Sequence, residues 1–565
     1  MKYESRPVRY IAYCLFLVSS AAWCGAADVA VAAGAPRVFD VRAFGATGDG
    51  KTLDTGAINK AIDAASAAGG GTVYFSAGTF ATYSVHLKSN IALYLDHGAT
   101  LLAADPPAVG EPGGYDAPEP NAFDWYEDFG HSHWHNSLIW GENLENVSIL
   151  GPGTIFGRGL SKGTGRKDPL PGEPRQGGAG GARGANPANG TAPAAAPAGP
   201  FGYPGRDTLP AGVGNKSIAL KNSHNVTIRD VSIRHGGHFA LLATGVDNLT
   251  IDNVKVDTNR DGFDIDCCWN VRISNCSVNS PWDDAIVLKS CYALGALRAT
   301  ENVTIANCYV TAGFLSGTLL DGTFQRAPTN YASHTGRIKF GTESNGGFKN
   351  ITIANCTFED CQGLALEIVD GGIMEDVTIN NIAMREIISA PIFIRLGNRA
   401  RGPEGTTVGA IRRVNISNVT VNNARYRLGS IISGIPGHPI EDVRISNLHF
   451  VQQGGGSKEE AARVPPESET AYPEPGMFGT MPSYGFFVRH VKNLEMRDVD
   501  LTFLKDEQRP VMVLTDVAGA DFDHIKARRT PEVPFFILKG VSDFTVRSIP
   551  GLPDTKFDKM EDGSL

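Results

Sequence analysis

Residues 225–233 read Asn225-Val-Thr-Ile-Arg-Asp-Val-Ser-Ile, and the pattern returns as Asn248-Leu-Thr-Ile-Asp-Asn-Val-Lys-Val and Asn270-Val-Arg-Ile-Ser-Asn-Cys-Ser-Val. These copies begin 23 and then 22 residues apart. Apolar and polar residues alternate in each copy and β-branched residues are frequent, which is typical of a strand with one buried face. Further copies begin at Asn146, Asn302, Asn350, Asp376, Arg413, Asp442 and Asn493.

A repeat of this length predicts a solenoid in which successive copies stack on one another. The period fits one turn of a right-handed parallel β-helix, whereas a propeller blade needs about twice as many residues. The alternation excludes a helical domain. Later copies are spaced more widely, which indicates loops inserted between strands. We therefore predict an all-β, right-handed parallel β-helix.

The 565 residues fit one solenoid domain over residues 36–550, because a solenoid grows by adding coils. Two stretches differ in composition. Residues 160–215 are rich in Gly, Pro and Ala and predict a flexible excursion between coils. Residues 454–483 form a polar loop insertion, which can either wall one end of a binding groove or be a dispensable surface loop.

A helix is expected before the first repeat. Asp54 or Thr55 can cap it, and its apolar face carries Ile58, Ala61, Ile62 and Ala65 before the glycines at 69–71 end it. We expect this helix, near Asp54–Ala67, to cover the open end of the solenoid and prevent edge-to-edge association.

The first 27 residues resemble a secretory signal. Basic residues lead into an apolar run from Tyr10 to Ala22, and small residues follow at Gly25-Ala26-Ala27. The run is short for a transmembrane span, and Trp23 is a poor fit for a lipoprotein signal at Cys24. We expect an exported protein, periplasmic or extracellular, with no membrane span in the mature chain.

Seven cysteines follow the signal. Cys276, Cys308 and Cys356 occupy the same position of the repeat, directly after an asparagine. This predicts a stacked ladder of small buried side chains. The odd number argues against a complete disulfide framework, and the spacing matches no zinc site.

Three carboxylates lie about one repeat apart. Asp261 stands in Asn259-Arg-Asp-Gly-Phe-Asp-Ile-Asp, and Asp283 and Asp284 stand in Trp282-Asp-Asp-Ala-Ile-Val-Leu-Lys-Ser. Stacking of coils gathers them at one place. Like charges cannot all ionise cheaply there, so one carboxyl keeps its proton as an acid and its neighbours serve as base. Hydrolysis of a glycosidic bond needs such a pair. Asp residues near turns often only bond backbone amides, which explains Asp266 but not this trio.

These two stretches resemble the Asn-Thr-Asp and Gly-Asp-Asp motifs of the polygalacturonases, glycoside hydrolase family 28. The resemblance extends from about Phe39 to the late repeats and includes Gly341-Thr-Glu-Ser, similar to the family's Gly-Ser-Glu segment. It implies that Asp283 is the general acid and that Asp261 and Asp284 activate the attacking water. The family uses the positions of Asn259 and Asp264 to contact the sugar.

The chain departs from the family at three places. The family's Gly-His-Gly register reads Thr335-Gly336-Arg337, with His334 close enough to substitute. The family's Arg-Ile-Lys, which grips the galacturonate carboxylate, would fall at residues 363–367, where no basic residue stands. Arg260 replaces the family's threonine. In these respects the chain is more similar to rhamnogalacturonan-acting members, so we expect rhamnogalacturonan-type or exo action rather than simple homogalacturonan hydrolysis.

Further candidate substrate-binding residues are His238, Arg337, Lys339 and Arg395. His238 precedes Asp261 by 23 residues and should stack beneath it. The basic residues suit bidentate recognition of a uronic acid. They are needed because a net charge of −9 attracts no polyanion, which also argues against a nucleic-acid partner.

The segment His131-Ser-His-Trp-His135 is similar to a metal site but lacks an acidic partner at a defined spacing. Sugar stacking by Trp134 is the favoured interpretation. We expect no metal and no cofactor.

Three functions stay open. The first is a monomeric glycoside hydrolase that cleaves pectic polysaccharides or oligosaccharides, by the single-displacement inversion that the family resemblance implies. The second is a polysaccharide lyase on the same fold, with calcium and a basic catalytic residue. The third is a non-catalytic glycan-binding solenoid. The trio of carboxylates favours the first.

Overall fold

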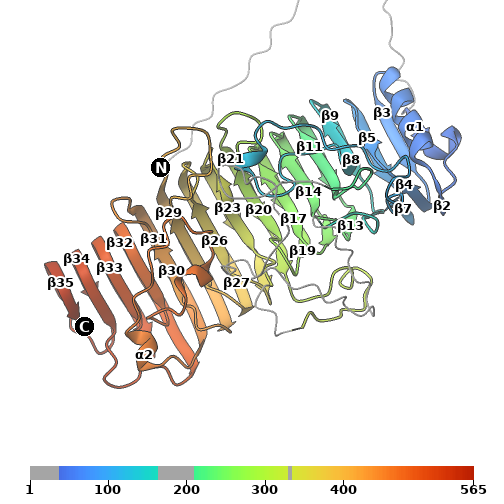
Figure 1. The fold of residues 1–565 in the computed structure, drawn as a ribbon. Helices are drawn as coiled ribbons and strands as arrows, with labels where there is room; N and C mark the ends of the chain where they lie inside the picture. Colours follow the sequence, from blue (N-terminus) through green and yellow to red (C-terminus); the bar gives the residue numbers. More distant parts are fainter. Residues whose placement is uncertain (1–36, 163–208, 329–333) are drawn as a thin grey trace, which may run out of the picture.

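The computed structural model describes residues 37–162, 209–328 and 334–565 (Figure 1). The expected signal at 1–27 and most of the expected excursion at 160–215 lie outside these ranges. The described residues form one elongated stack of parallel strands. Strand pairs such as Leu249 with Val271 are parallel, so the prediction of a parallel β-helix is confirmed.

Each coil contributes strands to three columns. The first, which carries the candidate site, comprises β5 (Val85–His86), β8 (Ser137–Glu142), β11 (Lys216–Lys221), β14 (Phe239–Thr244), β17 (Asp261–Asp266), β20 (Ile286–Ser290), β23 (Ile338–Ser344), β26 (Leu364–Ile368), β28 (Ile392–Leu396) and β30 (Ser430–Ser433). The second comprises β1 (Val38–Asp40), β3 (Gly71–Phe75), β6 (Ile91–Leu95), β9 (Glu145–Leu150), β12 (His224–Arg229), β15 (Asp247–Asp252), β18 (Trp269–Ser274), β21 (Thr300–Ala306) and β24 (Phe348–Ala354).

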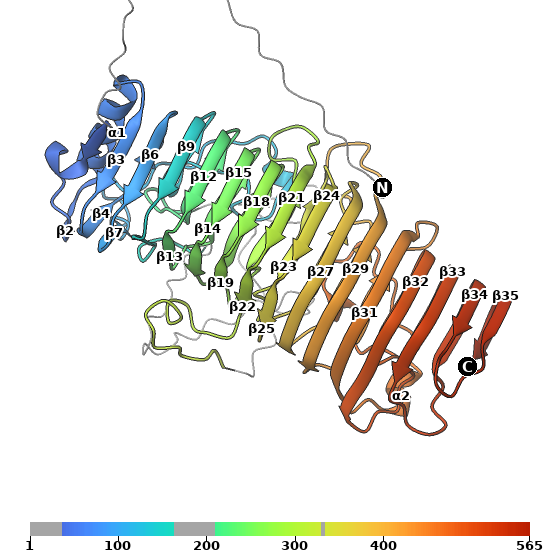
Figure 2. The same cartoon turned by 180° about the vertical axis from the view of Figure 1, so that it is seen from behind.

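The third column comprises β2 (Asp49–Leu53), β4 (Gly78–Thr82), β7 (Ala99–Ala103), β10 (Thr154–Phe156), β13 (Ser232–Arg234), β16 (Lys255–Asp257), β19 (Ser277–Asn279), β22 (Tyr309–Thr311) and β25 (Thr357–Glu359). From residue 373 onward the second and third columns merge into long strands, which Figure 2 shows from behind, and from Phe486 onward the first column joins them, since β30 pairs with the start of the next long strand. These are β27 (Ile373–Ile387), β29 (Ala410–Ala424), β31 (Ile440–Gly454), β32 (Phe486–Lys505), β33 (Met512–Ala527), β34 (Phe536–Arg547) and β35 (Thr555–Ser564).

The core runs along the axis of the stack. Alternate residues of each strand point inward, so equivalent positions of successive coils, such as Ile251, Ile273 and Ile305, lie against one another and are fully buried. Outward residues of the second and third columns face solvent, whereas those of the first column are buried beneath inserted segments. The first column therefore has both faces covered, and it can hold polar groups away from water.

The asparagines of the repeat form ladders along the stack. Asn307 lies at a φ of 56°, a left-handed conformation that asparagine tolerates better than most residues. Its side-chain amide donates to Asn275 Oδ1 (3.2 Å), and its Oδ1 accepts from Asn355 Nδ2 (3.2 Å). A second ladder joins Asn225, Asn248, Asn270 and Asn302 in the same manner. The repeated asparagine thus fixes both the turn and the stacking of coils.

Asn307→Ala should lower the free energy of unfolding by about 2 kcal/mol, because it loses two amide contacts and places alanine in a left-handed turn. Asn307→Gly loses the same contacts but tolerates the turn, so it should destabilise less. Denaturant titration of both variants checks this. Equal losses would show that the ladder alone matters and the backbone conformation does not.

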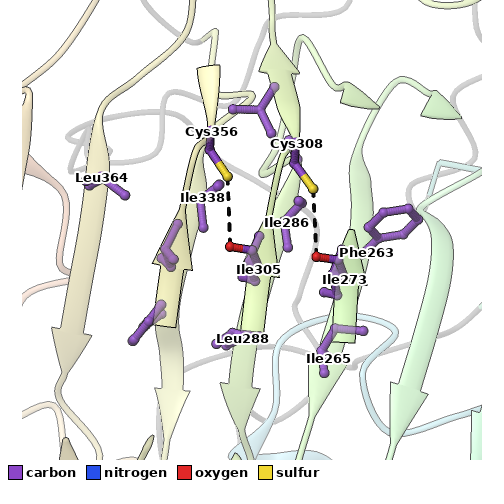
Figure 3. Close-up of a cluster of buried hydrophobic side chains, with 14 of the residues drawn as sticks. Phe263, Ile265, Ile273, Ile286, Leu288, Ile305, Cys308, Ile338, Cys356 and Leu364 are labelled. Atoms are coloured by element: carbon purple, nitrogen blue, oxygen red, sulfur yellow. Dashed lines mark hydrogen bonds between the residues drawn. The ribbon is translucent and has the colours of Figure 1, made fainter. Parts of the chain in front are cut away.

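The predicted cysteine ladder is present. Cys276, Cys308 and Cys356 stack in successive coils, all nearly inaccessible to solvent, and Figure 3 shows Cys308 and Cys356 among apolar side chains. Cys308 Sγ contacts the carbonyl oxygen of Ile273, and Cys356 Sγ that of Ile305, each at 4.0 Å. The seven cysteines within the described ranges are free thiols.

The ends of the stack are covered differently. Helix α1 (Thr55–Ala67) caps the first coil with Ile58, Ala61, Ile62 and Ala65 buried, as predicted. The Asp54 carboxylate does not bond its own helix; it accepts from the backbone of Thr47 and Gly48 and fastens the preceding turn. At the other end β35 pairs antiparallel with β34, so the sheet continues past residue 550, where the domain was expected to end.

The insertion at 454–483 is ordered over the first column. It contains α2 (Lys458–Ala461) and a short 3-10 helix, Pro475–Phe478. Two further 3-10 helices are Val41–Phe44 and Asp124–Tyr126. Among the described residues no helix has the length and apolar character needed to cross a membrane.

Candidate functional site

Three carboxylates meet where β17 and β20 begin. Asp261 is the first residue of β17, and the backbone N–H of Gly262 donates to the Asp284 carbonyl oxygen (3.0 Å), which stacks the two coils. One carboxylate oxygen from each of Asp261, Asp283 and Asp284 lies within 4.8 Å of the others. All three residues are buried. The convergence that the spacing predicted is therefore present.

Arg260 contacts Asp283 directly. Its NH2 and Nε groups donate to Asp283 Oδ2 at 2.7 and 3.2 Å. A guanidinium group at this distance favours the ionised carboxylate. The sequence analysis identified Arg260 only as a departure from the family motif, and nothing in the sequence indicated this contact.

Asp284 has its own basic partners. Arg337 Nε donates to Asp284 Oδ1 (2.9 Å), and Lys339 Nζ lies 3.6 Å from Asp284 Oδ2. Arg337 and Lys339 also lie close to Glu474 of the insertion, which accepts a hydrogen bond from Arg337 NH2 (2.7 Å). Despite burial, Glu474, Asp284 and Glu367 raise the pKa of Arg337, so its guanidinium stays charged. Both predicted basic residues thus lie beside the trio, and neither is without an acidic partner.

Asp261 lies in a more negative environment. Burial and the neighbouring charges of Asp283 and Asp264 raise its pKa well above the usual range. His238 Nε2 lies 3.9 Å from Asp261 Oδ2, so the predicted stacking of the two residues is present. The imidazole stacks on Phe129, with ring centroids 5.4 Å apart. Residues before β8 therefore reach back over the site.

Asp264 lies on the same strand as Asp261, and its charge helps to raise the pKa of Asp261. It is fully buried and its Oδ2 lies 3.1 Å from His131 Nε2. Burial and Lys289 disfavour the imidazolium, but Asp264 and Glu343 outweigh them and raise the pKa of His131 to about 9. The structure brings Asp264 to the edge of the trio. Asn259 lies one coil from Trp282, whose backbone N–H donates to the Asn259 carbonyl oxygen (3.1 Å).

A buried charge network lies at the other end of these strands, and the sequence analysis missed it. Glu343 accepts from Lys289 Nζ and from Arg401 NH2, each at 2.6 Å. Arg401 NH1 also donates to Asp128 Oδ1 (2.7 Å). Despite burial, Lys289, His131 and Arg401 hold the pKa of Glu343 well below its usual range. The network joins the segment around Asp128 to the sheet and so fixes the wall above the site.

The carboxyl of Glu367 stands one coil beyond Lys339, at 3.5 Å from its Nζ. Burial raises the pKa of Glu367 to about 8, and neither of its oxygens has a hydrogen-bond partner among the described residues. A protonated Glu367 does not repel a substrate carboxylate. Burial thus removes the negative charge that Glu367 would otherwise present to a substrate carboxylate.

Arg395 is not brought to the trio. Its NH1 donates to Ser433 Oγ and the Gly434 carbonyl oxygen, and its NH2 to the carbonyl oxygens of Glu467 and Ser468, all within 3.1 Å. It holds the insertion on the sheet instead of presenting its charge to a ligand. His334 packs edge-on against Trp282, with ring centroids 5.1 Å apart. Trp282 directly precedes Asp283 in the chain.

The expectation that Trp134 stacks on sugar is wrong. The side chain is fully buried and its indole N–H donates to Thr244 Oγ1 (3.1 Å). The histidines of the same segment do not converge on one point: His131 meets Asp264, His133 meets Asp124 (3.3 Å) and His135 meets Glu142 (3.2 Å). The three imidazoles thus pair with three different carboxylates, and they do not converge on one position where a metal ion could bind.

A second cluster consists of side chains of types that can coordinate a metal ion. Ligand atoms of Asp266, Cys267 and Cys291 lie within 4.8 Å of one another. The Cys291 thiol donates to Asp266 Oδ2 (2.6 Å), and burial raises the pKa of Asp266 to about 6. These contacts satisfy the cluster internally, so Asp266 serves the packing of the coil as expected.

Family models match two parts of the chain. One described as "Right handed beta helix region" matches residues 216–384, which confirms the predicted hand of the coil, and "Rhamnogalacturonase A/epimerase, pectate lyase-like" matches residues 38–101. The fold and the family models thus define the chain as a right-handed parallel β-helix protein.

Curated relatives narrow this class. The chain is 31% identical over 261 residues to an exo-poly-α-D-galacturonosidase of Dickeya chrysanthemi, over 44% of this chain and 42% of that protein. It is 24% identical to a probable polygalacturonase of Vitis vinifera, over 72% of each. The chain thus matches less than half of the length of the Dickeya protein.

Two solved structures share the fold. An exopolygalacturonase from Thermotoga maritima covers 94% of this chain and 95% of its own, with a TM-score of 0.53 and 17% identity. A family 28 exopolygalacturonase from Yersinia enterocolitica covers 90% of this chain and 78% of its own, with a TM-score of 0.51 and 17% identity. The chain is thus similar to a galacturonosidase and a polygalacturonase in sequence and to exopolygalacturonases in fold, as the resemblance to glycoside hydrolase family 28 implies.

Proposed function

We propose that the protein is a glycosidase that hydrolyses galacturonosidic bonds in pectic polysaccharides or oligosaccharides at Asp261, Asp283 and Asp284. The observation that carries the proposal is the meeting of three buried carboxylates, two of which face cations while the third has a raised pKa. One carboxyl that holds a proton beside two ionised ones is the set of groups that bond cleavage by acid and base requires. The names of the relatives support a galacturonate-containing substrate.

We propose a single displacement with inversion, in which two ionised carboxylates hold the water. The resemblance supports this. A separation within 4.8 Å is shorter than the roughly 6.5–9.5 Å of most inverting enzymes and would by itself suit retention. We favour inversion because three carboxylates are present and a retaining reaction needs two. NMR of the first-formed product anomer distinguishes the two mechanisms.

The substrate preference follows from the pairing of the basic residues. Arg337 and Lys339 face Glu474, Asp284 and Glu367, and Arg395 is occupied by backbone carbonyls. A galacturonate next to the scissile bond would have to compete for these cations, and each charge-assisted contact it loses is worth about 1.5–3 kcal/mol. We therefore propose rhamnogalacturonan-type or exo action in preference to cleavage within plain homogalacturonan.

The kcat/KM on rhamnose- and galacturonate-containing oligosaccharides should exceed that on homogalacturonan oligosaccharides by roughly ten- to a hundredfold, since about 1.4 kcal/mol is a factor of ten. Chromatography of early products on both substrates checks this and also separates exo from internal cleavage. Faster cleavage of homogalacturonan, with no gain from rhamnose, would contradict the proposal.

A lyase and a non-catalytic glycan binder are the alternatives. A lyase would release unsaturated, ultraviolet-absorbing product, and a binder would show no activity that depends on Asp283. We propose export by the signal at 1–27, with the periplasm or the medium as the destination, and a monomeric protein that consists of one β-helix domain. Cleavage of the precursor and light scattering of the mature protein test these points.

A further inference from the structure

The insertion at 454–483 places one carboxylate on the two cations that lie beside the trio. Glu474 accepts a hydrogen bond from Arg337 NH2 at 2.7 Å and lies 3.8 Å from Lys339 Nζ. The side chains of Arg337 and Lys339 are buried, whereas that of Glu474 is 28% exposed. Glu474 therefore lies on the solvent side of both cations.

Every nitrogen of the Arg337 guanidinium group has an acceptor. Nε donates to Asp284 Oδ1 (2.9 Å), NH1 to Gln362 Oε1 (2.7 Å) and NH2 to Glu474 Oε1 (2.7 Å). The carboxylate of a uronic acid binds a guanidinium group best through two nitrogens at once. Asp284 is buried and belongs to the coil itself. Glu474 is therefore the acid that a substrate carboxylate would have to replace at Arg337.

The charges around Lys339 lead to the same conclusion. Its Nζ lies 3.5 Å from Glu367, 3.6 Å from Asp284 and 3.8 Å from Glu474, and 5.5 Å from the ring centroid of Tyr472. Burial raises the pKa of Glu367 to about 8, so near neutral pH Asp284 and Glu474 supply the negative charge at the two cations. Without Glu474, one of the two positive charges would be left for a substrate carboxylate.

The insertion does not depend on Glu474 for its place on the sheet. Before Glu474 in the chain, Arg395 donates to the carbonyl oxygens of Glu467 and Ser468 at 2.9 and 3.1 Å. After it, Phe478 is buried in an apolar cluster with residues of β26, β28 and β30. Removal of the Glu474 side chain should therefore leave the insertion in position and change only what the two cations can bind.

We propose that Glu474 is a specificity-determining residue. Its carboxylate holds the position at Arg337 and Lys339 that the carboxylate of a galacturonate would otherwise take, so the sugar bound there is a neutral one. A galacturonate at this position meets a like charge, whereas a rhamnose, which carries no carboxylate, does not. The inference rests on the proposed function and assigns its substrate preference to one side chain.

Titration calorimetry with trigalacturonate and with its full methyl ester tests the proposal, because the two ligands carry the same sugars and differ in charge. The Asp283→Asn background is used to prevent turnover. Glu474→Ala opens the position and should tighten the binding of trigalacturonate by about ten- to a hundredfold, the contribution of one charge-assisted contact. Binding of the ester should change little. An equal change for acid and ester, or no gain for the acid, overturns the proposal.

Glu467→Ala is the matched control. Glu467 belongs to the same insertion, pairs with a buried arginine, Arg489, at 3.0 Å, and is also partly exposed. This variant should leave the affinity for both ligands unchanged. A gain for the acid as large as that of Glu474→Ala would show that a loosened insertion causes it, which contradicts the proposal.

Glu474→Gln decides the matter if Glu474→Ala does not fold. It keeps the volume of the side chain and removes its charge, so it should give a smaller gain of the same sign for the acid. An unchanged or weaker affinity for trigalacturonate in Glu474→Gln would show that the charge of Glu474 does not exclude a galacturonate.

Kinetics separate this inference from the proposed function. Glu474→Ala should raise kcat/KM on homogalacturonan oligosaccharides mainly through a lower KM, because the freed cations bind the carboxylate in the ground state as well as in the transition state. The gain on rhamnose-containing oligosaccharides should be smaller. A lower kcat on both substrates with no gain in KM would give Glu474 a positioning role at Asp284 and overturn the exclusion. If the unmodified protein hydrolyses no pectic substrate, the proposed function fails, and the calorimetry still decides the role of Glu474.

Discussion

Asp283→Asn should lower kcat on a pectic oligosaccharide by about 10²–10⁴-fold, the usual contribution of an acid or base group. The amide is nearly isosteric with the carboxylate, so the fold and KM should change little. It can neither give a proton nor accept one from water, so the expected loss holds whether Asp283 acts as acid or base. Steady-state kinetics and the circular dichroism spectrum of the variant measure the two effects.

Asp500→Asn is the matched control for this loss. It makes the same chemical change on a half-exposed residue of β32, 3.4 Å from His449 and outside the site. It should leave kcat unchanged. A rate for Asp283→Asn close to that of the control would remove Asp283 from the catalytic set.

Arg401→Met should lower the free energy of unfolding by about 3–5 kcal/mol, because it leaves Asp128 and Glu343 without a cation that they share. The Arg401 side chain is 1% exposed and Glu343 is fully buried, so water cannot replace the contact that Glu343 loses, and it reaches the Asp128 side chain only in part, since that side chain is 28% exposed. Denaturant titration measures the loss. Lys289 still contacts Glu343, which places the effect mainly on the segment around Asp128.

Arg547→Met is the control for burial. Arg547 lies 2.7 Å from Asp521, the same distance as Arg401 from Asp128. The side chains of Arg547 and Asp521 are each about two fifths exposed, however. Exposed pairs contribute little, so this variant should unfold much as the unmodified protein does. Comparable losses in the two variants would show that burial does not govern the strength of these ion pairs.

The local sequence was sufficient for the coil. The period of the Asn248 and Asn270 copies, the buried alternate residues and the capping helix at Thr55–Ala67 all appear in the structure, because each depends on neighbours close in the chain or one repeat away in register. The same repeat predicted that Asp261 lies close to Asp283 and Asp284, and that His238 lies beside Asp261. The structure shows both.

Contacts that involve inserted segments could not be predicted in this way. Trp134 was expected to meet sugar but lies in the interior, and Arg395 was expected to meet substrate but holds the carbonyl oxygens of Glu467 and Ser468. A loop has no periodicity, so its sequence does not indicate which coil it packs against. The contact of Glu474 with Arg337, across 137 positions of the chain, illustrates this.

By itself the sequence determined the fold class, the stacking of coils and the three carboxylates, because repeats convert sequence spacing into distance. Only the tertiary structure decided the electrical state of those carboxylates. Arg260 at Asp283, Arg337 at Asp284 and burial at Asp261 set which groups are charged. Charge depends on distance and on the exclusion of water, and both arise only when the chain has packed.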